Sequence, residues 1–255
     1  MRLRKAAWGV QMFEAPLVGV ASAKDELLEK FHETGVIGPW FRSPKRWLSE
    51  AETVVSLFFP FTKEVRDSNR ECNGVPSSLW LHGRIEGQSF IAEFMKRLRE
   101  EITAQGIQAC VPALDERFLS VMGGKGLEDY PEADERTYGS NWSERHAAYV
   151  CGLGTFGLSK GLITKKGMAG RFGSIILDLP LPADHRDYTG IYDYCTRCGR
   201  CIVRCPVDAI SFEKGKDHVI CEGKLKETKV TYAPRLGCGK CQVSVPCECQ
   251  IPGKR

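Results

Sequence analysis

The sequence predicts an α+β protein in two parts, a mixed α/β domain followed by a small domain held together by metal. Two observations lead to this prediction. Residues 1–187 contain apolar runs with the periods of strands and of helices. Nine of the twelve cysteines lie between Cys195 and Cys249, among glycines and short turns. We therefore expect one domain over residues 1–187 and a second over residues 188–255.

The first predicted elements lie near the amino terminus. Residues 17–20 form a short apolar run that predicts a strand. Ser22 and Asp25 then have the spacing of a capping box, which predicts a helix that ends at Gly35.

The central elements have the clearest patterns. Residues 53–59 form an apolar run that predicts a buried strand ending at Pro60. In residues 86–105 the apolar side chains recur at helical spacing with charges between them. The remaining predicted elements are a helix over residues 143–151 and strands over residues 107–111, 162–164 and 171–179.

The composition is that of a globular protein. The chain has 255 residues, of which 42% are apolar and 27% are charged, which excludes a disordered, a collagen-like or a polytopic membrane protein. The formal charge of +4 counts every cysteine as neutral. Two oxidised four-iron clusters, each at about −2 with its thiolates, would cancel it. Net charge therefore gives no argument for a nucleic-acid partner.

The amino terminus is basic, but it does not have the pattern of a signal peptide. Gln11, Glu14 and Pro16 interrupt the stretch where such a peptide has its apolar core. No apolar run is long enough to span a membrane. We therefore expect a cytoplasmic protein without a membrane partner.

The strongest motif is a run of four cysteines followed by a proline. Its sequence is Cys195-x-x-Cys198-x-x-Cys201-x-x-x-Cys205-Pro206. This spacing is typical of bacterial ferredoxins, in which three cysteines hold one [4Fe-4S] cluster and the fourth holds another. A zinc ribbon would instead have two separated cysteine pairs.

The later cysteines supply enough ligands for a second cluster. Crossed ligation predicts one cluster on Cys195, Cys198, Cys201 and a late cysteine, and the other on Cys205, Cys221, Cys238 and Cys241. The late cysteine is Cys247, which follows Pro246, or alternatively Cys249.

A glycine-rich segment precedes the cysteines. Gly152-Leu-Gly154-Thr-Phe-Gly157 matches the dinucleotide-binding pattern, but a predicted helix stands before it and a predicted strand after it, the reverse of what that pattern requires. Two interpretations remain open. The segment packs a helix against a sheet, or its backbone lies close to a large flat cofactor.

Several segments together resemble one family. They are residues 143–157, with the sequence SERHAAYVCGLGTFG, then Gly173-Ser174, the ferredoxin run, and Cys238-Gly-Lys-Cys241-Gln-Val-Ser-Val-Pro246. The chain resembles the superfamily of epoxyqueuosine reductases and reductive dehalogenases over nearly its whole length. The resemblance implies a nitroreductase-like domain that binds cobalamin or another corrinoid, followed by a ferredoxin-like domain with two [4Fe-4S] clusters.

The resemblance also implies roles for individual residues. Tyr138 occupies the position of the catalytic aspartate of epoxyqueuosine reductases, six residues before Glu144, and reductive dehalogenases use a tyrosine as proton donor. Val245 stands where the family has its last cysteine, so Cys247 takes that place. The residues implied to bind the corrinoid are Gly152, Gly154, Thr155, Phe156, Gly157, Ser159, Gly161 and Ser174.

The resemblance implies an iron–sulfur oxidoreductase that reductively cleaves a carbon–heteroatom bond at a corrinoid. Its partners would be a small-molecule substrate and an electron donor such as ferredoxin or flavodoxin, and a homodimer is conceivable. The alternatives are a corrinoid-free electron-transfer protein and a tRNA-modifying relative of epoxyqueuosine reductase, so nucleic acid is not excluded as a partner.

Overall fold

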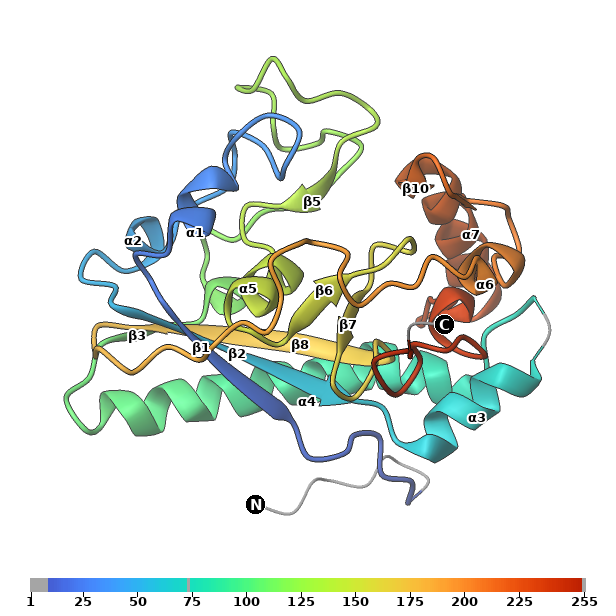
Figure 1. The fold of residues 1–255 in the computed structure, drawn as a ribbon, viewed down its shortest axis with the longest axis horizontal. Helices are drawn as coiled ribbons and strands as arrows, with labels where there is room; N and C mark the ends of the chain where they lie inside the picture. Colours follow the sequence, from blue (N-terminus) through green and yellow to red (C-terminus); the bar gives the residue numbers. More distant parts are fainter. Residues whose placement is uncertain (1–8, 73, 254–255) are drawn as a thin grey trace.

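A computed structural model describes residues 9–72 and 74–253. Its centre is an antiparallel sheet of four strands in the order β1 (Leu17–Ser22), β2 (Thr53–Pro60), β8 (Gly170–Leu177) and β3 (Ala109–Cys110) (Figure 1). β2 and β8 pair over eight residues each, from Thr53 opposite Leu177 to Pro60 opposite Gly170. This long pairing makes β2 and β8 the rigid centre of the protein.

The two faces of the sheet are covered by different helices. α4 (Ser78–Thr103) lies along one face and α5 (Glu144–Val150) lies on the other (Figure 1). Side chains alternate along β2 accordingly. Leu57 and Phe59 belong to the apolar cluster that contains Ile91 of α4. Val54 and Phe58 belong to the cluster that contains the buried residues of α5. Because both faces are buried, the strand reads as a continuous apolar run.

Further short elements lie between these. They are α1 (Glu26–Lys30), α2 (Pro44–Trp47), α3 (Lys63–Glu71), η1 (Pro112–Leu114) and two hairpins, β4 (Ser120–Met122) with β5 (Tyr138–Ser140) and β6 (Gly154–Phe156) with β7 (Leu162–Thr164).

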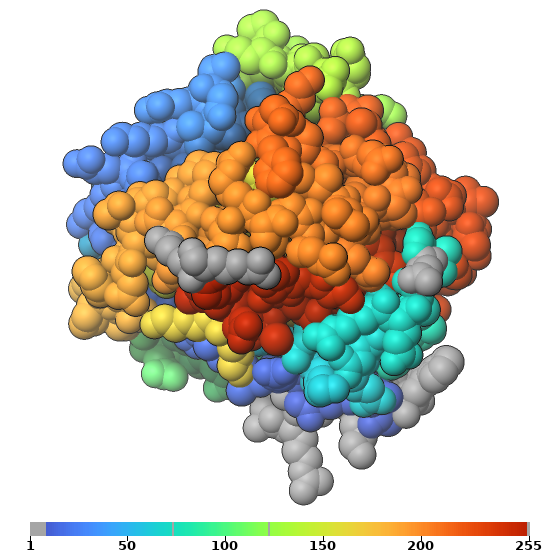
Figure 2. Space-filling model, turned by 45° about the vertical axis from the view of Figure 1, so that its right-hand side comes forward, coloured from blue at the N-terminus to red at the C-terminus, as the bar shows by residue number. Residues whose placement is uncertain are grey.

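The cysteine-rich segment contains α6 (Arg200–Val203), β9 (Ile210–Ser211), β10 (Gly215–Lys216), α7 (His218–Thr231) and η2 (Lys240–Gln242). It packs on α3. The Asn69 amide donates to the carbonyl oxygen of Cys238 at 3.1 Å, and Arg70 forms a two-pronged ion pair with the buried Glu248. In Figure 2 the red carboxyl-terminal residues lie between the cyan α3 and the orange segment. The division at residue 187 stays a prediction, as does the nitroreductase-like character of the first part.

Most of the predicted elements are confirmed, with shifted ends. The predicted strands at 17–20, 53–59, 162–164 and 171–179 correspond to β1, β2, β7 and β8, and the helix at 143–151 corresponds to α5. The strand predicted at 107–111 contains only the two residues of β3. The predicted capping box is wrong, because Asp25 itself accepts from the Leu27 amide and the helix ends at Lys30.

Two differences have clear physical causes. α4 begins at Ser78 because the Ser77 side chain caps it by accepting from the Trp80 amide. Gly83 interrupts the apolar pattern there, since the Phe61 ring occupies the place of its side chain. α7 was not predicted, because Glu222 and Thr228 are its only buried residues and it has no apolar face. No helix within residues 9–72 and 74–253 has the length and apolar character to cross a membrane.

Candidate functional site

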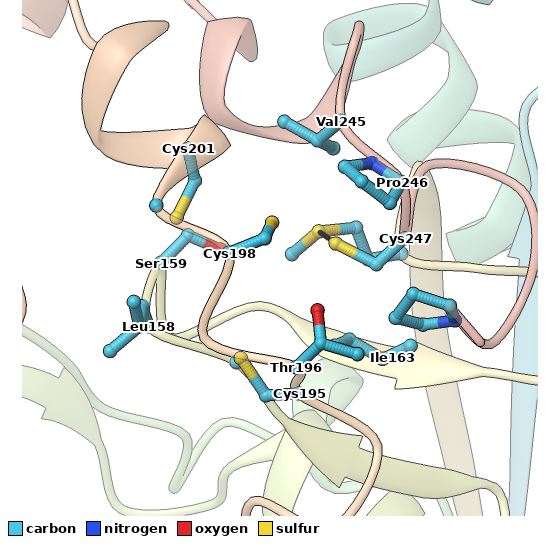
Figure 3. Close-up of a pocket in the computed structure, with 14 residues that line it drawn as sticks. Leu158, Ser159, Ile163, Cys195, Thr196, Cys198, Cys201, Val245, Pro246 and Cys247 are labelled. Carbon is cyan, nitrogen blue, oxygen red and sulfur yellow. Dashed lines mark hydrogen bonds between the residues drawn. The ribbon is translucent and has the colours of Figure 1, made fainter. Parts of the chain in front are cut away.

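Four cysteines from two distant segments surround one cavity. Cys195, Cys198 and Cys201 come from the loop before α6 and its first turn, and Cys247 comes from the carboxyl-terminal segment. Figure 3 shows the four sulfur atoms turned toward the same space. Met168 also lines it, and its sulfur lies 3.3 Å from that of Cys247. We call these four cysteines the first quartet.

Four other cysteines lie within electrostatic reach of one another. Burial raises the pKa of the Cys221 thiol, and the charges of Cys241 and Cys205 also raise it. Burial likewise raises the pKa of the Cys238 thiol, as do the charges of Cys241 and Cys221. Thiols influence one another in this way only over short distances. We call Cys205, Cys221, Cys238 and Cys241 the second quartet. Cys241 also acts on Cys201, so the two quartets are neighbours.

Without metal, two thiols of the first quartet resist ionisation. Burial, followed by the charges of Cys241, Cys195 and Cys198, raises the pKa of Cys201 to about 11. Burial, followed by the charges of the other three cysteines of the first quartet, raises the pKa of Cys247 to about 12. Cysteine ligands must be deprotonated to bind metal. A bound iron–sulfur cluster therefore has to supply the positive charge that stabilises these thiolates.

The quartets suit a cluster better than a single ion. Within the described part of the chain, no three His, Cys, Asp or Glu side chains gather closely enough to hold one metal ion. A four-iron cluster offers each thiolate an iron of its own, so its ligands need not meet at one point. Cys249, the predicted alternative to Cys247, is exposed and does not line the cavity of the first quartet.

Two donors point at sulfur atoms of the second quartet. The ammonium group of Lys216 lies 3.5 Å from the Cys241 sulfur, and the amide of Ala209 donates to the Cys205 sulfur at 3.2 Å. Hydrogen bonds to the sulfurs and nearby positive charge raise the reduction potential of an iron–sulfur cluster. β9 and β10 thus place groups that would tune a cluster on the second quartet.

Two glycines of the glycine-rich segment face the chain's own atoms, and the corrinoid site stays a prediction. A Cβ on Gly154 would lie 1.9 Å from the Ile163 carbonyl oxygen, and one on Gly161 would lie 2.2 Å from the Met168 methyl group. These faces are therefore filled by the chain's own β6–β7 hairpin and the residues that follow it. A Cβ on Gly157 would lie 3.7 Å from the Cys195 sulfur, and Gly157 and Ser159 line the cavity of the first quartet. The segment thus lies against the predicted cluster.

The other residues predicted to bind the corrinoid are also engaged internally. Thr155 is fully buried, and its hydroxyl accepts from the Tyr194 amide at 2.9 Å. Ser174 is fully buried and accepts from the Trp142 indole at 2.8 Å. A Cβ on Gly152 would lie 3.3 Å from the His185 carbonyl oxygen. Phe156 is half-buried, with its ring centre 4.8 Å from that of His146.

Tyr138, the predicted proton donor, is joined to α7. Its hydroxyl donates to the Glu222 carboxylate, and its ring stacks on His218 with 6.0 Å between the centres. The hydrogen bond to Glu222 raises the pKa of Tyr138 to about 12. The same bond, with that from Lys226, lowers the pKa of Glu222. Tyr138 therefore holds its proton at neutral pH, and its role as a donor stays a prediction.

Several charged residues that the sequence analysis did not single out lie near this region. Burial raises the pKa of Glu144 to about 7, and the nearby Ser174 hydroxyl offsets this only in part. Neither Glu144 carboxylate oxygen has a partner with good hydrogen-bond geometry. Arg84, Arg145 and Arg171 also belong to this group. Glu144 and Arg145 were visible in the sequence only as fixed points of a motif, and nothing marked Arg84 or Arg171.

Two cysteines before the cluster motif, Cys110 and Cys151, are buried. Cys151 is buried and its thiol donates to the Val54 carbonyl oxygen at 3.4 Å. Cys110 is buried, and burial raises its pKa to about 11. These thiols are poor nucleophiles and poor metal ligands.

Comparison with known proteins agrees with this picture. The family described as "4Fe-4S binding domain" matches residues 188–211, so the chain contains a [4Fe-4S]-binding motif. Over 169 residues the chain is 46% identical to an epoxyqueuosine reductase of Leadbetterella byssophila, which covers 66% of this chain and 46% of that protein. The chain thus spans about half the length of this curated relative.

Solved structures share the fold. The epoxyqueuosine reductase of Streptococcus thermophilus is 17% identical, with a TM-score of 0.51 over 91% of this chain and 62% of the other. The catabolic reductive dehalogenase NpRdhA is 19% identical, with a TM-score of 0.54 over 92% of this chain and 30% of the other. The predicted mixed α/β fold is therefore the one found in both kinds of reductase.

Proposed function

We propose that this chain, which is similar in sequence to an epoxyqueuosine reductase and shares its fold with reductive dehalogenases, is an iron–sulfur reductase that cleaves a carbon–heteroatom bond in a small molecule. The observation that supports this most directly is the arrangement of eight cysteines in two neighbouring quartets. Each quartet would hold one [4Fe-4S] cluster.

The two quartets differ in their surroundings. Cys198 of the first quartet is exposed, so an electron donor such as ferredoxin or flavodoxin can reach this cluster. Cys221 and Cys238 of the second quartet lie near Arg84, and Cys241 lies near Arg145. Electrons would enter at the first cluster and reach the substrate from the second. We order the clusters in this way because Cys198 is exposed and because the second quartet lies near Arg84 and Arg145.

Two clusters suit the reaction because reductive cleavage needs two electrons. The electron pair enters the bond between carbon and the heteroatom, the bond breaks, and the heteroatom leaves as an anion. A proton must then reach the carbon or the leaving atom. Tyr138 holds a proton at neutral pH, and Lys226 stabilises its partner Glu222 as a carboxylate. Tyr138 would act as general acid only toward a strong base such as a carbanion or alkoxide.

The prediction that this chain binds a corrinoid rests only on the family resemblance. The predicted glycine segment gives no support for that role, because the chain's own atoms fill the Cβ positions of Gly154 and Gly161. We therefore assign no step to a corrinoid. Titration of the anaerobically reconstituted protein with cobalamin, followed by absorption, tests this point. Stoichiometric binding would support a corrinoid, and lack of binding would leave the clusters as the cofactors.

The proposal is tested with reduced protein and two probe substrates, an epoxide and an aryl halide. After removal of excess reductant, the account predicts that one probe reoxidises both clusters and yields the cleaved product. Tyr138→Phe should abolish product formation and leave both cluster signals unchanged. The control is Tyr192→Phe, which alters an exposed tyrosine.

The rival functions give different results in this experiment. A protein that only transfers electrons would be reoxidised by flavodoxin and by neither probe. A tRNA-modifying relative would reduce an epoxide only within an RNA. The name of the curated relative, an epoxyqueuosine reductase, supports the tRNA-modifying function.

A further inference from the structure

The cysteine that completes the first quartet belongs to a segment without regular structure. Three cysteines of this quartet lie in the loop before α6 and in its first turn, whereas Cys247 reaches the same cavity from the carboxyl-terminal segment (Figure 3). None of the described residues after η2 belongs to a helix or a strand. The position of the Cys247 sulfur therefore depends on individual contacts made by its own segment.

Glu248 closes the turn that carries Cys247. The backbone amide of Glu248 donates to the carbonyl oxygen of Val245 at 3.0 Å. Its side chain folds back along the same turn, and its Oε2 atom accepts from the Ser244 amide at 2.8 Å. Ser244 has a left-handed backbone conformation with a φ of 56°, which is uncommon for a residue other than glycine. Glu248 thus fixes both ends of a short turn that contains Cys247.

The same carboxylate joins this turn to α3. Arg70 donates to Oε2 of Glu248 from Nε at 2.9 Å and to Oε1 from Nη2 at 2.6 Å. The Nε atom of Arg66 lies 3.4 Å from Oε1. Two-pronged pairs of this kind are strong and directional, and the Glu248 side chain is only 2% exposed, so water screens it weakly. Asp67 and Glu14 pair with the two arginines in turn and hold them in place.

Backbone contacts hold the other side of the turn. The Met168 amide donates to the carbonyl oxygen of Cys247 at 3.0 Å, and the Ala169 amide donates to that of Glu248 at 3.1 Å. A Cβ on Gly167 would lie 2.3 Å from the carbonyl group of Glu248, so the segment passes directly over this glycine. The residues just before β8 therefore fix the backbone of the segment, and the Glu248 carboxylate adds the link to α3.

Glu248 lies between two cysteines, of which one lines the cavity. Cys247 faces the other sulfur atoms of the first quartet, whereas Cys249 is exposed and does not line that cavity. An apolar side chain at position 248 could bury as much surface, but it would not fix the direction of the turn. A carboxylate held by two-pronged hydrogen bonds does so, because these bonds require one geometry. The direction of the turn decides which sulfur meets the cluster.

We propose that Glu248 is a positioning residue for the cluster on the first quartet: its carboxylate, held by Arg70 and by the Ser244 amide, keeps the Cys247 thiolate in place as the fourth ligand. Residues that orient metal ligands change the metal affinity about 10–100-fold when they are replaced. This inference rests on the proposed function, because it requires a [4Fe-4S] cluster on the first quartet.

The test follows the irons of the first cluster and not turnover. The reference protein is anaerobically reconstituted Cys249→Ser, in which the neighbouring thiol cannot replace Cys247. Adding Glu248→Gln keeps an acceptor for the Ser244 amide and removes the charge contacts with α3. If Cys247 no longer holds its iron, oxidation by ferricyanide takes one electron from the cluster, and that iron leaves as a divalent ion. A three-iron cluster then remains on the other three cysteines of the quartet.

We expect Glu248→Gln to show a three-iron signal by electron paramagnetic resonance after this oxidation. A chelator should remove iron from its first cluster at an about 10–100-fold lower concentration than in the reference protein. The signal of the second cluster should stay unchanged, which shows that the segment is still folded. Arg70→Gln should act like Glu248→Gln, and Arg70→Lys, which keeps the charge, should retain more of the first cluster.

A matched control breaks a different ion pair between the two parts of the chain. Glu86 of α4 pairs with Arg235 of the cysteine-rich segment, and this pair does not include the turn. Glu86→Gln should therefore behave like the reference protein. A first cluster in Glu248→Gln that withstands ferricyanide and chelator as well as the reference would overturn the proposal. So would equal loss of both clusters, which would mean general instability. A reference protein without iron would instead contradict the clusters themselves.

Discussion

The ammonium group of Lys240 donates a hydrogen bond of 2.6 Å to the backbone carbonyl oxygen of Asn69. Lys240 lies between Cys238 and Cys241 of the second quartet and is almost fully buried. It also reaches the carbonyl oxygen of Cys72, so one side chain satisfies the carboxyl-terminal end of α3. Burial lowers the pKa of Lys240. The contact ties the cysteine-rich segment to the first part of the chain.

Lys240→Met should therefore loosen the cysteine-rich segment. The substitution keeps most of the side-chain volume and leaves buried carbonyl oxygens without a donor, at a cost of about 1–3 kcal/mol. We expect faster hydrogen exchange in residues 238–242 and in α3, with unchanged exchange in β2 and β8. Lys229→Met removes an exposed lysine of α7 and is the control. Unchanged exchange in Lys240→Met would mean that the contact does not hold the segment.

Lys216→Gln should lower the reduction potential of one cluster. Lys216 places its charge 3.5 Å from the Cys241 sulfur, which stabilises the reduced, more negative cluster. Its loss should shift the potential of the second cluster by roughly −60 mV, a tenfold change in a one-electron equilibrium. Redox titration monitored by electron paramagnetic resonance measures this. Lys214→Gln removes an exposed lysine nearby, and it should shift neither cluster. A larger shift in that control would refute a direct effect of Lys216.

Glu144→Gln should change how stability depends on pH. Burial raises the pKa of Glu144 from 4.5 to about 7, so the folded state holds this proton longer than the unfolded state. The contribution of the neutral carboxyl is complete below pH 4.5 and is lost as pH rises to about 7. Glu144→Gln cannot ionise, so it avoids this loss of folding stability, which amounts to roughly 3 kcal/mol. Thermal melts at pH 5 and pH 8 should show Glu144→Gln gaining on the wild type at pH 8, and Glu64→Gln, on the surface of α3, should not.

Cys247→Ser and Cys249→Ser should differ, although the two residues are close in sequence. Cys247 faces the cavity of the first quartet, and Cys249 is exposed outside it. Cys247→Ser should lose most of the signal of the first cluster and keep that of the second. Cys249→Ser should retain both. The reverse result would make Cys249 the ligand and contradict the quartet.

Sequence patterns predicted the elements whose periodicity reflects burial. β2 and most of α4 are buried along regular faces, so their patterns are visible without the fold. α7 is solvated nearly all round, and its cap at Asp217 is the only local signal of its start. The predicted cysteine partition rests on spacing, because a ferredoxin run fixes which sulfurs can share a cluster.

The glycine segment could not be interpreted from the sequence. Gly154 lacks a side chain because the opposite strand of its own hairpin lies there. A glycine pattern shows that something approaches the backbone, but the fold decides what does.

The central claim is that eight cysteines hold two four-iron clusters, and the most direct test is a count of iron and acid-labile sulfide. After anaerobic reconstitution and desalting, the account predicts about eight irons and eight sulfides per chain, because two [4Fe-4S] clusters contain that number. Four irons per chain would mean that only one quartet holds a cluster. Stoichiometric zinc in place of iron would contradict the assignment of both quartets to iron–sulfur clusters.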